Sequence, residues 1–269
     1  MKILVPRICL TILVASLFSS CVNSQKATSS VTKLPQQFVD SIAADGAASD
    51  WTIGSVQYNK EIKAFFSVAN NTKTMYLILE INDPMQQLKA IRNGITFGFD
   101  ISGKKRRKAT VNYPLPSGNE FGMMQHNTND GQQDRSALLT RLLAKKNELE
   151  LSGFNSSLNG VQSLFSSTTG IKAAIKIDAD GMMIYELAVP FELWDTKVTF
   201  DTPISIDFVI NGAEPPSGGG SGGGGGDKMG GPGKGMSSGR PGGKSMGQTS
   251  MKDMFVENSF WYKCSFASK

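Results

Sequence analysis

The sequence predicts a mainly β protein, an antiparallel β-sandwich of the jelly-roll or immunoglobulin-like class. Apolar residues recur at every second position in Met75–Ile81, in Ile95–Ile101 and in Ile171–Ile177. This period of two is typical of strands with one buried face. Residues that favour tight turns separate neighbouring runs at Asn70–Lys73 and at Asp178–Gly181. Strands with one apolar face need a second layer to bury it, which favours two stacked sheets.

The first half of the chain is expected to contain two hairpins. The turn Asn70–Lys73 joins two strands between Phe65 and Ile81, and Ile95–Ile101 adds a third after one helical turn near Met85. The basic run Ser102–Lys108 then forms the tip of a second hairpin, which returns through Ala109–Tyr113. We interpret these charges as a solvated tip that discourages pairing between sheet edges. Attraction to an anionic surface, such as lipid head groups or acidic glycan, is the alternative.

The periodicity changes in residues 134–147, which predicts an amphipathic helix packed on the sandwich. Four leucines fall on one face of this helix: Leu138, Leu139, Leu142 and Leu143. A further hairpin follows, with strands at Ile171–Ile177 and Met182–Val189, and another strand is expected at Pro203–Ile210.

Residues 215–250 have no apolar period and consist largely of Gly, Ser, Met, Pro and Lys, which predicts disorder. A last strand is nevertheless expected within Phe255–Ala267, where Phe260, Tyr262, Cys264 and Phe266 share one face. The glycine-rich segment is therefore interpreted as an insertion between two strands. Such an insertion costs little, because loop-closure entropy grows only slowly with length.

The N-terminus predicts export. Residues 1–20 combine early positive charges with the short apolar run Ile8–Phe18, as a signal peptide does, and the run is too short to span a bilayer. Leu17–Cys21 resembles the lipobox of bacterial lipoproteins, which implies a lipid on Cys21. Residues 21–40 would then be a tether, residues 41–269 a single domain, and the protein would be anchored in the bacterial cell envelope, at the outer membrane. Simple cleavage of the signal is the alternative.

The charge and the cysteine content limit the classes of function and the disulfides to be expected. The net charge of +5 is a mild excess and does not indicate a nucleic-acid partner. Cys9 lies in the signal and Cys21 is the lipid acceptor, so Cys264 cannot form a disulfide within the mature domain. Its position among aromatic residues predicts a buried, inert thiol.

No catalytic or metal-binding constellation is apparent, and no cofactor is expected. His126 is the only histidine, in a loop-like setting, so neither a hydrolytic triad nor a zinc site has its usual residues. Asp178 and Asp180 are interpreted as turn residues rather than calcium ligands. The Gly-x-Ser-x-Gly pattern at Gly235–Gly239 lies in low-complexity sequence without the strand and helix that the hydrolase motif needs. We therefore expect a non-catalytic protein.

Four segments resemble the β-sandwiches of family 9 carbohydrate-binding modules and DOMON-like domains: Asp45–Trp51, Asn70–Pro84, Gly94–Asp100 and Tyr185–Trp194. The resemblance covers most of Ile42–Asn211 and implies a sandwich fold with a sugar ligand. The helix at residues 134–147 and the glycine-rich insertion depart from the compact pattern of the family.

Two functions follow as hypotheses. In the first, a cell-envelope lipoprotein binds glycan through exposed aromatic side chains. Trp261 is a candidate because it points away from the aromatic face of the last strand, and Trp51 is another; packing in the core is the alternative for each. In the second, the protein binds another protein, or is an accessory subunit of an envelope complex, with no affinity for glycan.

Overall fold

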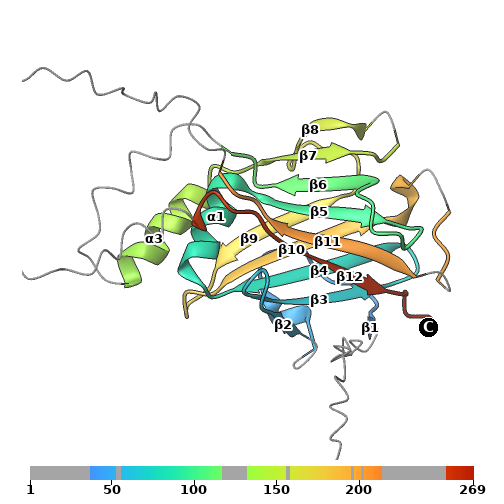
Figure 1. Cartoon of the computed structure of the whole chain (residues 1–269), viewed down its shortest axis with the longest axis horizontal. Coiled ribbons are helices and arrows are strands. Elements are labelled where there is room, and N and C mark those ends of the chain that lie inside the picture. Colours follow the sequence, from blue (N-terminus) through green and yellow to red (C-terminus); the bar gives the residue numbers. More distant parts are fainter. Residues whose placement is uncertain are drawn as a thin grey trace, which may run out of the picture. The chain divides into compact units, whose positions relative to one another are not determined.

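The computed structural model describes residues 37–52, 56–116, 132–155, 158–194, 197–200, 203–213 and 253–269, with only the backbone for residues 132–134. These residues form two facing six-stranded sheets, which confirms the predicted β-sandwich (Figure 1). All strand pairs are antiparallel except the short pair of β1 with β3. The signal peptide, Cys21, His126 and the insertion at residues 215–250 lie outside the described residues.

The first sheet contains the two predicted hairpins whose turns are Asn70–Lys73 and Asp178–Gly181. Its strand order is β1-β3-β4-β10-β9, with β2 also paired to β3. The strands are β1 (Gln37–Phe38), β2 (Gln57–Asn59), β3 (Ala64–Asn70), β4 (Thr74–Ile81), β9 (Lys172–Ile177) and β10 (Met183–Pro190). Because β1 pairs with β3, residues 37–40, which were expected in the tether, belong to the folded domain.

The second sheet has the order β12-β11-β5-β6-β7-β8. Its strands are β5 (Ile95–Asp100), β6 (Ala109–Tyr113), β7 (Glu148–Ser152), β8 (Gly160–Ser163), β11 (Ile204–Ile210) and β12 (Asn258–Cys264). The third predicted strand, β5, therefore does not extend the sheet of β3 and β4 but lies in the facing one. Strand β8 was not expected, since its sequence Gly-Val-Gln-Ser carries no apolar alternation.

Helix α1 (Pro84–Asn93) is the reason that β5 changes sheets. It is a full helix rather than the single turn expected, because Asp83 caps it by accepting hydrogen bonds from the backbone N–H groups of Met85 and Gln86. Gly94 ends it at φ 85°, and a Cβ there would lie 2.5 Å from the carbonyl oxygen of Pro114. The helix thus carries the chain from the end of β4 to the start of β5.

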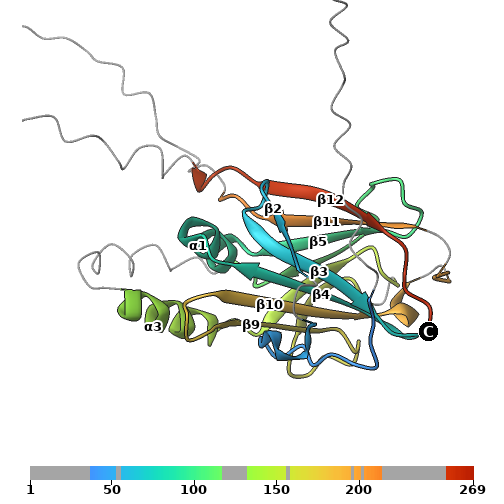
Figure 2. The same ribbon diagram turned by 90° about the horizontal axis from the view of Figure 1, so that it is seen from below.

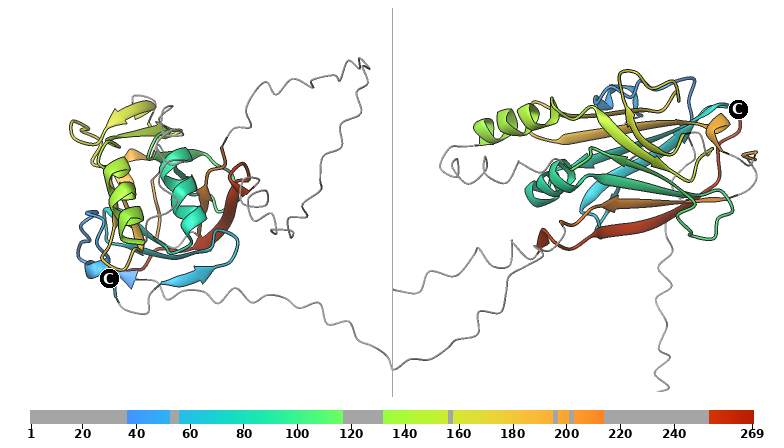
Figure 3. Two further views of the ribbon diagram at one scale, coloured as in Figure 1. Left: turned by 90° about the vertical axis from the view of Figure 1, so that its left-hand side faces the viewer. Right: turned by 90° about the horizontal axis from the view of Figure 1, so that it is seen from above.

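The predicted amphipathic helix is α3 (Gln132–Leu143), which ends at Leu143 rather than near residue 147. Its leucines are buried as expected, with Leu139, Leu142 and Leu143 at most 7% exposed. The helix does not lie on an outer face of the sandwich. It lies beside α1 at one end, where Arg135 donates hydrogen bonds to the Gln87 side chain and the Pro84 carbonyl (Figure 3).

The main core lies between the two sheets and is rich in aromatic rings. Phe97 of β5 packs against Tyr185 of β10, with ring centroids 5.2 Å apart, and against Phe208 of β11 at the same distance. Phe66 of β3 contacts Phe208 at 5.1 Å. Cys264 is buried in this core together with Tyr262 and Phe266, as the alternation of the last strand predicted.

A second apolar cluster covers the outer face of the first sheet, because β4 and β10 are apolar on both sides. Tyr76, Ile78, Ile184 and Ala188 are buried there under Ile42 and Trp51. The covering segment, which includes the 3-10 helix η1 (Ala48–Asp50), is held by the buried carboxylate of Glu186. One oxygen of Glu186 accepts hydrogen bonds from the backbone N–H groups of residues 45, 46 and 47, at 2.7–3.3 Å, and the other accepts the Trp51 indole N–H at 2.7 Å.

Strands β11 and β12 are neighbours in the second sheet, so the predicted insertion does lie between two paired strands. The chain leaves and returns at one place, where the Ala213 N–H donates to the Met254 carbonyl oxygen at 2.8 Å. The returning segment is held by Lys89 of α1, whose side chain is buried and donates to the Val256 carbonyl and to Asn258. Burial lowers the pKa of Lys89, against the opposing effect of nearby carboxylates.

We expect Glu186→Gln to destabilise the domain by about 2–3 kcal/mol, because an amide –NH₂ would face backbone donors that now meet a carboxylate oxygen. Urea denaturation measures this loss. The control is Glu150→Gln on the exposed side of β7, which should change stability by less than about 0.5 kcal/mol. Equal midpoints for the two variants would contradict the role given to Glu186.

Candidate functional site

A pocket of about 370 Å³ opens at the end of the sandwich that is opposite α1 and α3. Strand β5 begins next to α1 and runs to this end, where the loop to β6 starts (Figure 2). Five separate segments line the pocket: the end of β5, the start of β6, Gly153 directly after β7, the stretch after β10 and the start of β11. Its lining includes Phe99, Ile101, Lys108, Trp194, Lys197 and Ile204.

The apolar floor of the pocket is built around Trp194. Strand β10 ends at Pro190, the 3-10 helix η3 (Phe191–Leu193) follows, and Trp194 comes directly after it. Its indole meets the ring of Phe99 edge-on, with centroids 5.3 Å apart and planes at 90°, and lies 5.1 Å from Phe154. The indole Nε1 is shielded from solvent and has no hydrogen-bond acceptor among the described residues.

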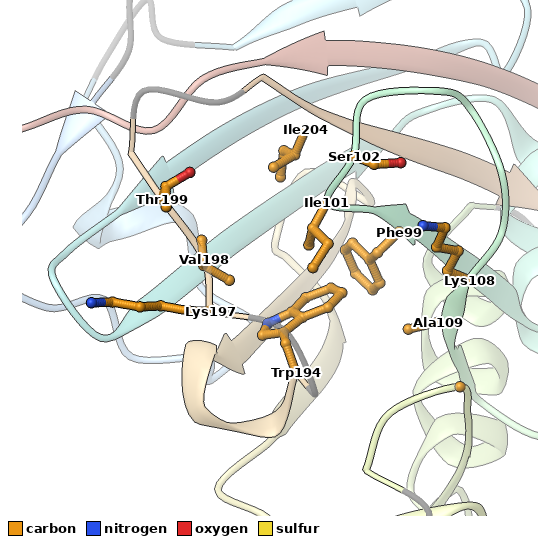
Figure 4. A pocket seen from close by; sticks show the side chains of 11 residues that line it. Phe99, Ile101, Ser102, Lys108, Ala109, Trp194, Lys197, Val198, Thr199 and Ile204 are labelled. Carbon is orange, nitrogen blue, oxygen red and sulfur yellow. The ribbon is translucent and has the colours of Figure 1, made fainter.

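The rim of the pocket is polar and positively charged. Figure 4 shows Lys108 on one side of Trp194 and Lys197 on the other, with Ser102 and Thr199 above the apolar side chains. The Lys108 side chain is 52% exposed, with its Nζ 4.0 Å from the buried carboxylate of Asp100. Lys197 is also exposed and extends outward in Figure 4. The pocket therefore combines an aromatic floor with two cations.

The loop Ser102–Lys108 beside the pocket is organised by Asp100, whose side chain is fully buried. Its two oxygens accept hydrogen bonds from the Ser102 hydroxyl at 2.6 Å and from the backbone N–H groups of Ser102, Lys104 and Arg106 at 2.9–3.1 Å. Burial alone would raise the pKa of Asp100, but these hydrogen bonds and the charge of Lys108 outweigh it and hold the pKa below its ordinary value.

A second anchor of the same loop crosses the outer face of the second sheet. Arg107 lies over Gly98, where an added Cβ would stand 2.8 Å from its Cγ, and donates to the buried Asp207 carboxylate at 2.6 Å. Glu257 accepts a further hydrogen bond from Arg107 at 3.1 Å. Burial raises the pKa of Asp207, and Arg107 lowers it only in part. The basic loop is thus fixed to the sheet on both sides of its exposed tip.

The two tryptophans predicted to bind ligand lie elsewhere. Trp51 is 7% exposed and bonded to Glu186, so neither ring face is open to a sugar. Trp261 is half-buried on the outer face of β12, opposite Asp207 in register, and it does point away from the aromatic core face. The structure brings neither of them to the end pocket. Cys21, the predicted lipid acceptor, lies outside the described residues.

Sequence reasoning did not select the pocket residues as a group. The basic run containing Lys108 was recognised, and Trp194 was placed at the end of a strand, but Lys197 carried no signal of its own. A pocket assembled from five separate segments leaves no local pattern. The one usable signal for the pocket was Trp194, an aromatic residue shortly after Pro190, with Lys197 three positions further on.

Within the described residues, no group of three or more His, Cys, Asp or Glu side chains is arranged to hold a metal ion. In the same part of the chain, no helix has the length and apolar character needed to cross a bilayer.

The described residues define a mainly β, two-sheet sandwich with a pocket at one end. No family model matches the chain, and no curated protein matches it. Two solved structures that it resembles are of a carbohydrate-binding module family 9 from Caldicellulosiruptor kristjanssonii, in complex with glucose and with cellotriose. They share 13% and 12% identity with TM-scores of 0.34 and 0.33, and the matches cover 67% and 66% of this chain and 80% and 76% of theirs. Similarity at this level does not identify a ligand.

We expect Asp100→Asn to cost about 1–3 kcal/mol of stability at neutral pH, because the loop donors lose a charged acceptor. Since the pKa of Asp100 is lowered on folding, its contribution is present above the ordinary aspartate value of about 3.9 and is lost as the pH falls through the lower folded value. Denaturation curves of the two proteins should therefore converge in acid. Asp180→Asn, in an exposed turn, is the control. A stability difference between the parent protein and Asp100→Asn that is the same at all pH values would contradict the role given to Asp100.

Proposed function

We propose that this protein is a non-catalytic cell-envelope module that binds an acidic sugar, bearing a carboxylate or a sulfate, in the end pocket. The observation that carries the proposal is the pocket itself, which joins the indole of Trp194 to the cations Lys108 and Lys197. Ligand pockets are typically lined by aromatic side chains with a few placed polar groups. The apolar faces of a sugar ring suit the floor, and its charged substituent suits the rim.

The charge of the rim is the basis for choosing an acidic sugar over a neutral one. Hydrogen bonds from an ammonium group to a carboxylate or sulfate are stronger than those to a neutral hydroxyl. No side-chain carboxylate lines the pocket, and that of Asp100, near Lys108, is already engaged with its own loop. A bound anion would therefore meet Lys197 and Lys108, of which only Lys108 faces a carboxylate, that of Asp100 at 4.0 Å.

We further propose that Cys21 carries a lipid after removal of residues 1–20, and that the protein is held in the bacterial envelope at the outer membrane. The support is the sequence pattern of the N-terminus alone.

If Cys21 is lipidated, the protein from membranes should partition into the detergent phase of a Triton X-114 separation. Cys21→Ser should move it to the aqueous phase or leave the signal uncleaved, which mass spectrometry distinguishes. Equal partitioning of the two proteins, with both signals cleaved, would favour simple secretion.

Isothermal titration with acidic oligosaccharides, set against neutral ones of the same length, tests the sugar site. We expect binding to the acidic series only, reduced about tenfold or more by Lys197→Ala and by Lys108→Gln, since each removes one charge-assisted contact. Lys145→Ala, an exposed lysine just after α3 at the opposite end of the sandwich and outside the pocket lining, is the matched control.

Trp261→Ala tests the alternative that the sugar binds at Trp261 rather than in the end pocket. Binding that survives both lysine changes and disappears with Trp261→Ala would place the sugar on the outer face of the second sheet and overturn the pocket assignment. A folded protein that binds no sugar in either series would favour a role as a protein-binding or accessory subunit.

A further inference from the structure

Three cations at the tip of the β5–β6 loop are presented to solvent. The side chains of Lys104, Lys105 and Arg106 are exposed, and within the described residues no carboxylate lies at ion-pair distance from them. These three residues do not line the end pocket. The backbone carries them in a tight path, in which Lys105 adopts φ 57°. Neither the fold nor the proposed sugar site uses these three charges.

Hydrogen bonds hold the backbone of the loop where it presents these charges. Asp100 accepts the backbone N–H groups of Lys104 and Arg106, and Arg107 is fixed to Asp207 on the sheet. Buried Asp100 and Asp207 therefore hold the backbone, while the three cationic side chains point to solvent. A partner would bind a surface whose backbone is already ordered, which lowers the entropic cost of association.

The chain enters the domain at the same end of the sandwich. Strand β1 pairs with the last residues of β3, where Phe38 lies opposite Asn70, and β5 and the basic loop end at this side (Figure 1). Lys73, Lys197 and Lys263 are also exposed there, with Gly103 of the loop close to Lys263. The acidic residues Asp40 and Glu192 only partly offset this charge.

The length of the preceding segment sets the distance to a membrane. Between Cys21 and Gln37 lie about 15 residues, which can span at most about 50 Å. If Cys21 is lipidated, the entry end of the domain is the end held near the bilayer. This step rests on the lipid anchor proposed above, whereas the charge and the backbone hydrogen bonds of the loop do not.

We propose that the loop tip Lys104–Arg106 docks onto the anionic phospholipid headgroups of a membrane. Each basic residue near an anionic surface strengthens binding by about fivefold, so three together contribute about 100-fold. The attraction is electrostatic and falls within about 10 Å at 0.1 M salt. Docking would set the orientation of the domain, with its entry end toward the lipid and α1 and α3 away from it.

Vesicle co-sedimentation tests this with the chain from residue 22 onward, which contains the whole compact unit Lys33–Lys269 but no lipid. We expect binding to phosphatidylglycerol-containing vesicles, none to pure phosphatidylcholine, and a steep loss with added salt. The variant Lys104→Gln/Lys105→Gln/Arg106→Gln should bind about 100-fold more weakly. Because these side chains are exposed, its urea midpoint should equal that of the parent protein.

The matched control is Lys60→Gln/Arg141→Gln/Lys145→Gln, which removes the same charge from exposed positions at the opposite end, at the start of β3 and around α3. It should bind vesicles as the parent does. Equal loss in the two triple variants would mean attraction through net charge alone and would overturn the proposal, as would the absence of binding at low salt.

The two proposals fail separately. Lys197→Ala should reduce sugar binding and weaken vesicle binding far less than the loop variant, whereas the loop variant should weaken vesicle binding and leave sugar binding unchanged. If the loop variant instead abolishes binding of acidic sugars and no vesicle binds the parent protein, the loop belongs to the sugar site and the membrane proposal is overturned.

Discussion

The contact between the inner faces of β4 and β10 and those of β5 and β11 is the interaction on which the rest of the structure depends. Phe97 meets both Tyr185 and Phe208, and Phe66 meets Phe208 from the first sheet, so aromatic rings join the two sheets across their centre. Offset and edge-on rings of this kind bury large areas and fix the separation of the layers. With the sheets held apart at a fixed distance, each end of the sandwich needs its own closure.

The two ends are closed differently, and the difference creates the site. Helices α1 and α3 cover one end with buried side chains. Loops cover the other, and these loops are held by buried carboxylates rather than by apolar packing alone. Asp100 and Asp207 fix the basic loop, as Glu186 fixes the segment before Trp51. A carboxylate accepts several N–H donors at once, so it can order a short loop that has little hydrophobic surface.

The sequence predicts what depends on local periodicity. Alternation located most strands, the leucine spacing located α3, and the aromatic face of the last strand predicted the burial of Cys264. Alternation could not show that β5 lies in the facing sheet, since a strand has the same pattern in either one, although Asp83 and Pro84 were a usable signal for the start of α1. The organising role of Glu186 depends on a residue 140 positions away, and the pocket around Trp194 on residues up to 95 positions away, for which one sequence carries no local sign.

The exit and return of the chain at Ala213 and Met254 are joined by a backbone hydrogen bond, so the two ends of the insertion are held together by the described part of the fold. Lys89 and Asn258, both outside the insertion, hold the returning segment. The entropic cost of closing the inserted loop grows only logarithmically with the length of the loop. This junction is therefore a position at which the inserted sequence could be exchanged for another with little change to the sandwich.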